Sequence, residues 1–349
     1  MTQTTAPRSL HPPGDPPGDP PASPAVRPTR RLASGLVPRI SLVGIWALMA
    51  IVYAIIEPHT FLQAGTAQTI FGSQVELVFL ALALICTFVV GEFDLSVASI
   101  MGLAATIVPL LVVDHGWSPV AATVIALMAA TAVGTLNGFL VVVIGVDAIV
   151  ATLGMATFIV GITLALTNLE AVQGLGAGYS DIALTSILGL PVSFYYGLVA
   201  SLLLAYVLAF TPLGLRMSFV GAGHEVARLA GVNVRRIRFG SYVASGAICG
   251  LAGVIVTASL GGYDPNISTT YLLPAFAAVF LGTAVVQPGK FNPIGMLIGV
   301  YFLQTGIVGL QLAGLTGWVN QVFYGGTLVL AVAITTLIQR RAARRPAHA

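Results

Sequence analysis

The sequence predicts an all-α polytopic membrane protein of about ten transmembrane helices, and three observations carry this prediction. The chain of 349 residues is 57% hydrophobic. Charged residues make up only 8% of it, whereas soluble domains carry about 25%. The apolar residues form runs of about 20 residues rather than alternating patterns, which favours helices over the strands of a membrane barrel. These observations exclude a soluble enzyme, a nucleic-acid-binding protein and a disordered protein.

Hydropathy divides the chain into one membrane domain and two tails. Residues 1–39 are rich in proline and predict a disordered cytoplasmic tail, and residues 339–349 predict a basic cytoplasmic tail. The membrane domain covers 40–338 and contains one long polar loop at 211–238. The expected spans lie at about 40–56, 73–91, 95–113, 118–143, 147–167, 194–210, 239–259, 271–286, 291–312 and 318–338.

Basic residues indicate which links face the cytoplasm. No Lys or Arg occurs between Arg39 and Arg216, and the others gather in the two tails, in the 211–238 loop and at Lys290. Because cytoplasmic loops carry an excess of Lys and Arg, all four places are expected inside, and the spans give an even number of crossings between them. Both termini are therefore expected in the cytoplasm. The expected outer links are 57–72, 114–117, 168–193, 260–270 and 313–317.

The 211–238 loop predicts a short amphipathic helix over 224–230. Gly223 can start this helix and Gly231 can end it, while Glu225 favours the positive end of the helix dipole. Glu225 and Arg228 are three residues apart and can pair on the surface. Two interpretations of this helix are equally compatible with its composition. It can dock against a soluble partner, or it can be a plain surface helix that arginines hold near anionic lipid.

Four stretches resemble the ribose-type permeases of ATP-binding-cassette importers. Residues 223–233, Gly-His-Glu-Val-Ala-Arg-Leu-Ala-Gly-Val-Asn, are similar to the cytoplasmic coupling segment of that family, and 91–97 resemble its Gly-Gly-x-Asp-Leu-Ser-Val signature, with Glu92 for the second Gly. Asn-Gly at 137–138, followed by Ile-Val-Ala-Thr-Leu-Gly at 149–154, and the stretch 245–271 continue in the same order. The likeness covers about 40–338 and implies membership of the branched-chain amino acid and ribose permease superfamily.

The resemblance implies a multi-pass permease subunit in a bacterial cell membrane that passes a monosaccharide or similar small polar solute by alternating access. It implies three protein partners: a cytoplasmic ATPase, an extracellular solute-binding protein, and a second copy or a sister permease. The chain holds no Gly-x-x-x-x-Gly-Lys-Ser/Thr motif, so ATP and Mg²⁺ are expected on the ATPase, with no cofactor, metal or catalytic residue here. The residues expected to couple to the ATPase are Gly223, His224, Glu225, Ala227, Arg228, Gly231 and Asn233.

Polar residues near the ends of the spans are candidates for the solute path. Glu92, Asp94 and Asp147 are all expected at span ends close to water, where a charge costs little. Capping of the helix that begins at Leu95 is favoured for Asp94 over contact with solute. Uncharged polar groups can hydrogen-bond either a sugar or a neighbouring helix. The path or signature candidates are Asp94, Ser96, Asn137, Thr152 and Asn168.

The expected outer link at 261–271 is polar and contains two tyrosines, which are enriched at protein contacts and at membrane interfaces. It is a candidate for docking the solute-binding protein, with an interfacial anchor as the alternative. The docking candidates are Tyr263, Asp264, Asn266 and Tyr271.

Two further patterns predict packing rather than chemistry. Cys86 and Cys249 lie inside apolar runs, which is typical of small core residues. Small residues repeat at four-residue spacing, as in close helix packing, at Gly134/Gly138, Gly246/Gly250 and Gly295/Gly299. The rival function is a stand-alone ion-coupled carrier or channel, against which stand the scarcity of charge within the spans and the 223–233 segment.

Overall fold

The computed structural model describes residue 2 and residues 36–315 and 317–343. The first described helix begins at Leu36. The predicted tail over 1–39 therefore lies outside the described residues, except for Thr2 and residues 36–39. Of the predicted tail over 339–349, residues 339–343 continue the last helix, and the remainder lies outside the described part.

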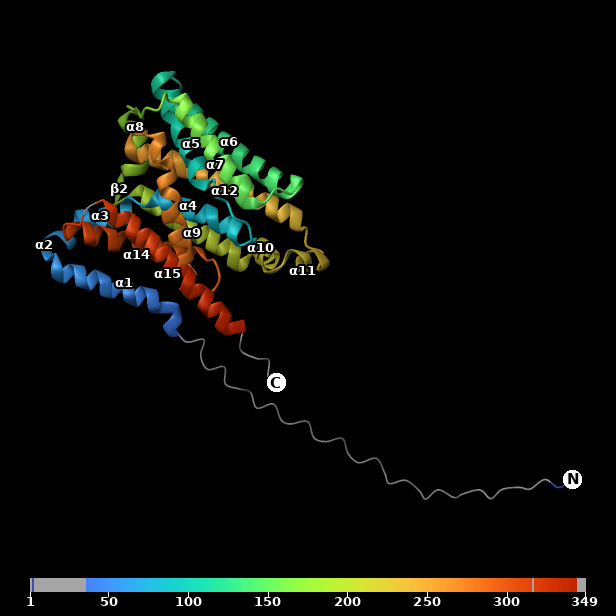
Figure 1. Cartoon of the computed structure of the whole chain (residues 1–349). Helices are drawn as coiled ribbons and strands as arrows, with labels where there is room; N and C mark the ends of the chain where they lie inside the picture. The colour runs from blue at the N-terminus through green and yellow to red at the C-terminus, as the bar shows by residue number, and fades with distance from the viewer. Residues whose placement is uncertain (1, 3–35, 316, 344–349) are drawn as a thin grey trace. The chain divides into compact units, whose positions relative to one another are not determined.

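The described chain is almost entirely helical (Figure 1). Two π-helical turns, η1 and η2, continue α5 and α6, and η3 is a 3-10 helix. The elements are α1 (Leu36–Ile56), α2 (Pro58–Phe61), α3 (Ala64–Gly72), α4 (Val75–Phe88), α5 (Val97–Pro109), η1 (Leu110–Asp114), α6 (Pro119–Gly138), η2 (Phe139–Ile144), α7 (Ala148–Leu166), β1 (Val172–Gln173), α8 (Ala177–Leu184), β2 (Ser186–Ile187), β3 (Leu190–Pro191), α9 (Val192–Phe210), α10 (Pro212–Ala222), α11 (His224–Leu229), α12 (Val234–Leu260), β4 (Gly262–Tyr263), η3 (Pro265–Tyr271), α13 (Leu272–Gly282), α14 (Pro293–Leu312) and α15 (Trp318–Ala343).

Each predicted span contains a helix, but the helices are not all long enough to cross a membrane. Among the described residues, seven helical segments have the length and apolar composition of a span. The apolar parts Leu42–Ile56 and Trp318–Ala333 are shorter. Helix α13 has 11 residues and so rises about 16 Å, roughly half of a hydrocarbon core about 30 Å thick. The structure therefore shows an all-α multi-pass protein, and the number of ten spans stays a prediction.

Helix α12 is the centre of the packing and contacts α4, α5 and α6 along its 27 residues. Every residue of α4 except Glu76 is buried, which agrees with a helix that is apolar on all sides. The described cysteines are free and buried in this region, as their apolar surroundings predicted.

Glycines allow α6 and α12 to approach backbone to backbone. A Cβ on Gly134 would lie 2.5 Å from the carbonyl oxygen of Tyr242, and one on Gly246 would lie 2.7 Å from that of Ala130. A Cβ on Gly299 would lie 2.7 Å from the carbonyl oxygen of Ala278, so α13 and α14 pack in the same way. The interpretation of these repeats as helix packing is confirmed.

Links predicted on the same side of the membrane lie at the same end of the bundle. Strand β1 pairs antiparallel with β4, and Gln68 Nε2 donates to the carbonyl oxygen of Gly189 at 3.0 Å, which brings expected outer links together. Helices α2, α3 and α8 lie at one end of the bundle, and α10 and α11 lie at the other (Figure 1). We call these the outer and inner ends, after the predicted topology.

Substitution of Gly134 tests the α6–α12 contact. We expect Gly134→Ala to destabilise the protein by about 1–3 kcal/mol because its Cβ would overlap the backbone of α12. Gly154→Ala in α7 is the matched control: a Cβ there meets nothing within 4 Å, and alanine is the better helix former. The midpoint of thermal unfolding in detergent measures both, and equal midpoints would contradict the contact.

Candidate functional site

The 211–238 loop folds into two short helices at the inner end. Helix α11 covers 224–229, with Gly223 before it and Gly231 after it at a φ of +80°, a conformation that favours glycine. The guanidinium of Arg228 donates to Glu225 Oε2 at 2.6 Å, and both side chains are exposed. The predicted helix and its surface pair are therefore confirmed. Asn233 Oδ1 accepts from the backbone N–H of Arg236 and caps α12.

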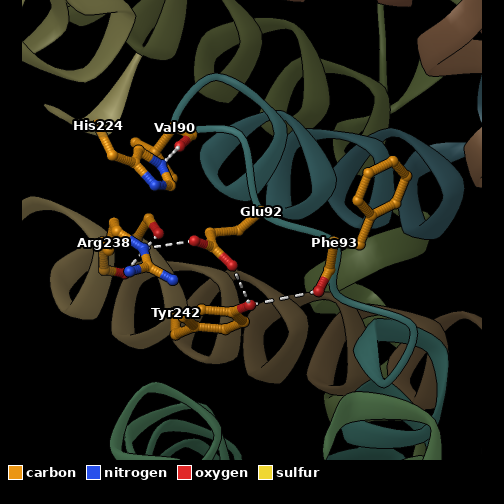
Figure 2. Close-up of polar contacts among 7 residues, drawn as sticks. Val90, Glu92, Phe93, His224, Arg238 and Tyr242 are labelled. Atoms are coloured by element: carbon orange, nitrogen blue, oxygen red, sulfur yellow. Dashed lines mark hydrogen bonds and ion pairs between the residues drawn. The ribbon is translucent and has the colours of Figure 1, made fainter. Parts of the chain in front are cut away.

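Helix α11 is attached to the segment that connects α4 and α5. The side chain of His224 donates from Nε2 to the carbonyl oxygen of Val90 at 3.1 Å (Figure 2). A Cβ on Gly221 would collide with the carbonyl of Val89, so α10 also lies directly on this segment. Val90 and Ala227 are buried in the same small apolar cluster. A displacement of α11 must therefore displace residues 89–96 or break these contacts.

Glu92, which follows in this segment, is buried against α12. Its carboxylate forms an ion pair with Arg238 and accepts a hydrogen bond from Arg238 Nε (Figure 2). The hydroxyl of Tyr242 donates a second hydrogen bond, to Glu92 Oε2, at 3.2 Å. The expectation that Glu92 lies near water is wrong, since the residue is 4% exposed. The ion pair and the hydroxyl offset the cost of removing the carboxylate from water.

Asp94 lies deeper and is fully buried, which also contradicts the expectation of a solvated position. Its Oδ1 accepts from the backbone N–H of Ser96 at 3.0 Å and from Ser96 Oγ at 2.6 Å, while Ser245 Oγ donates to Oδ2 at 3.0 Å. Helix α5 begins at Val97 rather than Leu95, so Asp94 fixes the turn before the helix instead of capping its first turn. Burial raises the pKa of Asp94, and these hydrogen bonds oppose the rise.

Asn137 and Thr152 join the same group. Asn137 Nδ2 donates to Ser96 Oγ at 2.7 Å, and the backbone N–H of Leu95 donates to Thr152 Oγ1 at 3.0 Å. Asn137 Oδ1 is buried without a hydrogen-bond partner among the described residues, and such an acceptor is costly to bury. We call this group, together with the half-buried Arg238, the inner polar cluster. Its members are Glu92, Asp94, Ser96, Asn137, Thr152, Arg238, Tyr242 and Ser245.

Asn168 does not belong to this cluster. It follows α7 at the outer end, is exposed and has a φ of +51°. Asp147, predicted beside water, is exposed and caps α7 by accepting from the backbone N–H groups of Ile149 and Val150. The structure thus brings together four of the five path candidates and separates the fifth.

The outer segment 261–271 presents only part of its predicted docking set to the surface. Tyr263 is 1% exposed and donates its hydroxyl to Ser268 Oγ at 3.2 Å, so its side chain supports the segment from within. Asn266 is exposed, and its Nδ2 donates to Asp264 Oδ1 at 2.8 Å. Asp264 and Tyr271 are half-buried.

Glu76 was not among the predicted site residues, yet it lies on α4 near the outer end and lines a cavity of about 520 Å³. Tyr271 and two glutamines of α14, Gln304 and Gln311, line the same cavity. A carboxylate inside an apolar run is rare at membrane depth and usually faces a cavity or a partner. The sequence does place Glu76 inside an apolar run, so this residue could have been found from the sequence. The two glutamines come close to Glu76 only in the folded protein.

Comparison with known proteins identifies the family. The family model described as "Branched-chain amino acid transport system / permease component" matches residues 67–332. The chain belongs to this permease family. It is 31% identical over 293 residues to the autoinducer 2 import system permease protein LsrC of Salmonella choleraesuis, covering 82% of this chain and 84% of that protein. No solved structure matches the chain.

Two more relatives are permeases of named sugar systems. The ribose import permease protein RbsC of Bacillus subtilis is 32% identical over 250 residues, 70% of this chain and 77% of the relative. The D-allose transport system permease protein AlsC of Escherichia coli is 27% identical over 300 residues, which cover 85% of this chain and 92% of the relative. The resemblance seen in the motifs is confirmed. The chain is a multi-pass membrane permease subunit of an ATP-binding-cassette importer, and the ion-coupled carrier is not favoured.

A double-mutant cycle tests the Glu92–Arg238 pair. We expect Arg238→Gln to destabilise the protein by about 3 kcal/mol because Glu92 would stay buried without its cation. Glu92→Gln combined with Arg238→Gln is expected to recover part of this loss. Unfolding midpoints of the two single variants and the double variant in detergent measure the coupling. Losses that simply add would show that the two side chains do not interact.

Proposed function

We propose that this chain is the gate of a monosaccharide importer and that a separate ATPase moves it through α11. The observation that carries the proposal is that α11 is exposed on one side and bonded to the α4–α5 segment on the other. An exposed helix with such contacts can receive a force from a soluble partner and pass it to the membrane helices. ATP and Mg²⁺ belong to the partner, and this chain carries no step of hydrolysis.

The exposed face of α11 favours a protein partner. Val226 is 64% exposed and Leu229 is 84% exposed, beside the charged pair of Glu225 and Arg228. Apolar side chains ringed by charges are typical of protein interfaces. The carboxylate of Glu225 would be repelled by anionic lipid, which argues against a helix held only at the membrane surface.

The connection from α11 to the helices is short and polar. His224 holds Val90, and two residues later Glu92 is held by Arg238 and Tyr242 of α12. When ATP binding closes the ATPase pair, α11 moves, and the inner polar cluster carries the α4–α5 segment and the start of α12 with it. A partner can shift such an equilibrium only by its differential affinity for the two states. The hydrogen bonds of the cluster support its movement as one unit, since buried polar groups have few alternative arrangements.

The proposals for the other partners and for the solute are drawn from the related permeases. A second permease, identical or a sister chain, would complete the channel, and a solute-binding protein would dock on the exposed parts of 261–271. The relatives are named for the import of ribose, D-allose and autoinducer 2, which supports a monosaccharide or similar small polar solute here.

Removal of the surface pair tests the ATPase contact. We expect Glu225→Ala with Arg228→Ala to weaken recovery of the ATPase in pull-down and to lower uptake about tenfold, the effect of roughly 1.4 kcal/mol of lost contact energy. Insertion into the membrane should be normal. Glu57→Ala with Gln63→Ala, at the outer end, is the control. Normal ATPase recovery and uptake in the α11 variant would overturn the docking assignment.

A charge at Asn266 tests the outer docking surface. Because Asn266 is exposed on η3, we expect Asn266→Arg to weaken capture of the solute-binding protein about tenfold while the ATPase still binds. Gln63→Arg, an exposed outer residue on another link, is the matched control. Capture is measured with the complete importer in lipid discs. Equal capture by both variants would mean that the binding protein docks elsewhere.

A further inference from the structure

The outer cavity is lined by five elements from three separate parts of the chain. It lies between α4, the end of η3, the start of α13, the second half of α14 and the start of α15, and its volume is about 520 Å³. Sites for small molecules measure about 300–1,000 Å³, so one small solute fits. The cavity is on the outer end of the bundle, where the solute would arrive.

Its polar lining suits hydroxyl groups. Gln304 and Gln311 come from α14, Asn320 and Gln321 from α15, and Glu76 from α4. Amide side chains both donate and accept hydrogen bonds, and a carboxylate accepts them, which matches the alternating hydroxyls of a sugar. Leu77 and Ile307 supply apolar wall for the C–H faces.

Part of this lining is held in place. Gln311 Nε2 donates to Asn320 Oδ1 at 3.1 Å, which ties α14 to α15 across the cavity wall. Within the described part of the chain, Glu76 forms no ion pair. Its carboxylate is therefore available to a ligand.

The charge of the lining discriminates between solute classes. Among its lining residues there is no Lys, Arg or His, and Glu76 is the one residue with a carboxyl group. An amino acid would bring its own carboxylate into this cavity without a cationic side chain to meet it. Its ammonium group can pair with Glu76, but its carboxylate would lose water without gaining a partner, which is strongly unfavourable. A neutral polyol meets no such penalty.

We propose that this cavity is the outward-facing solute site of the permease and that it selects neutral polyhydroxy solutes over amino acids. The proposal rests on the proposed function as an importer. Tyr271 lines the cavity and ends the outer segment 261–271, so a binding protein docked on that segment would release its solute directly over the cavity.

Cysteine accessibility tests the location of the site in the complete importer. We expect Gln304→Cys to react with a membrane-impermeant methanethiosulfonate added outside intact cells, since Gln304 is half-buried at the cavity. Thr305→Cys, one residue further on the same helix and buried, is the matched control and should not react. Cys86 and Cys249 are both buried and give a low background. No reaction at Gln304→Cys, or equal reaction at both, would overturn the proposal.

Protection from labelling tests the solute class. D-ribose, D-allose, D-xylose and D-galactose are the probes for neutral solutes, and L-leucine is the probe for amino acids. At least one sugar should slow the labelling of Gln304→Cys about tenfold, and leucine should leave it unchanged. Slowing by leucine, or by none of these probes, would overturn the proposal.

Uptake separates this proposal from the proposed function. We expect Gln304→Leu with Gln311→Leu to lower uptake of the protecting sugar about tenfold while ATPase recovery stays normal. Gln68→Leu, an exposed outer residue away from the cavity, is the control. Normal uptake here, together with loss of uptake in the α11 variant, would remove the solute site and leave the importer. Normal uptake in both variants would overturn the docking of the ATPase on α11 as well.

Discussion

The burial of Glu92 against Arg238 and Tyr242 is the interaction on which the inner end of the molecule depends. It fixes the α4–α5 segment to the first turns of α12, and this segment is also the surface on which α10 and α11 rest. A buried carboxylate tolerates few geometries, because each one must satisfy its charge and its hydrogen bonds. The segment therefore has a defined position, which a loop of apolar residues would not have.

The same constraint explains why so much polarity is buried at this end. Asp94 has no cationic partner among the described residues, and serines from its own segment and from α12 donate hydrogen bonds to its carboxylate. Asn137 reaches the cluster from α6, which glycines bring to backbone contact with α12. Close packing of α6 against α12 and hydrogen bonding within the cluster thus depend on each other. A larger residue at Gly134 or Gly246 would separate these two helices and break the hydrogen bonds between them and the α4–α5 segment.

Local features were predictable from sequence, and long-range ones were not. Gly223 and Gly231 marked the ends of α11 correctly because helix termination is decided within a few residues. The depth of Glu92 was not predictable, since its partner Arg238 is 146 residues further along the chain. Tyr263 was expected at the surface for its residue type, yet its exposure is set by packing. The outer cavity was missed because its glutamines meet Glu76 only in the folded bundle.

Helix α4 links the two polar regions. Its first turn carries Glu76 in the wall of the outer cavity, and its last residue, Phe88, leads directly into the segment held by α11 and α12. The helix has 14 residues, so it bridges about 20 Å, and apart from Glu76 it is buried along its whole length. A close-packed helix moves as a unit, because its neighbours leave no room for local bending. In the proposed importer, a displacement of α11 would therefore reach the outer cavity through α4 without any change in the helix itself.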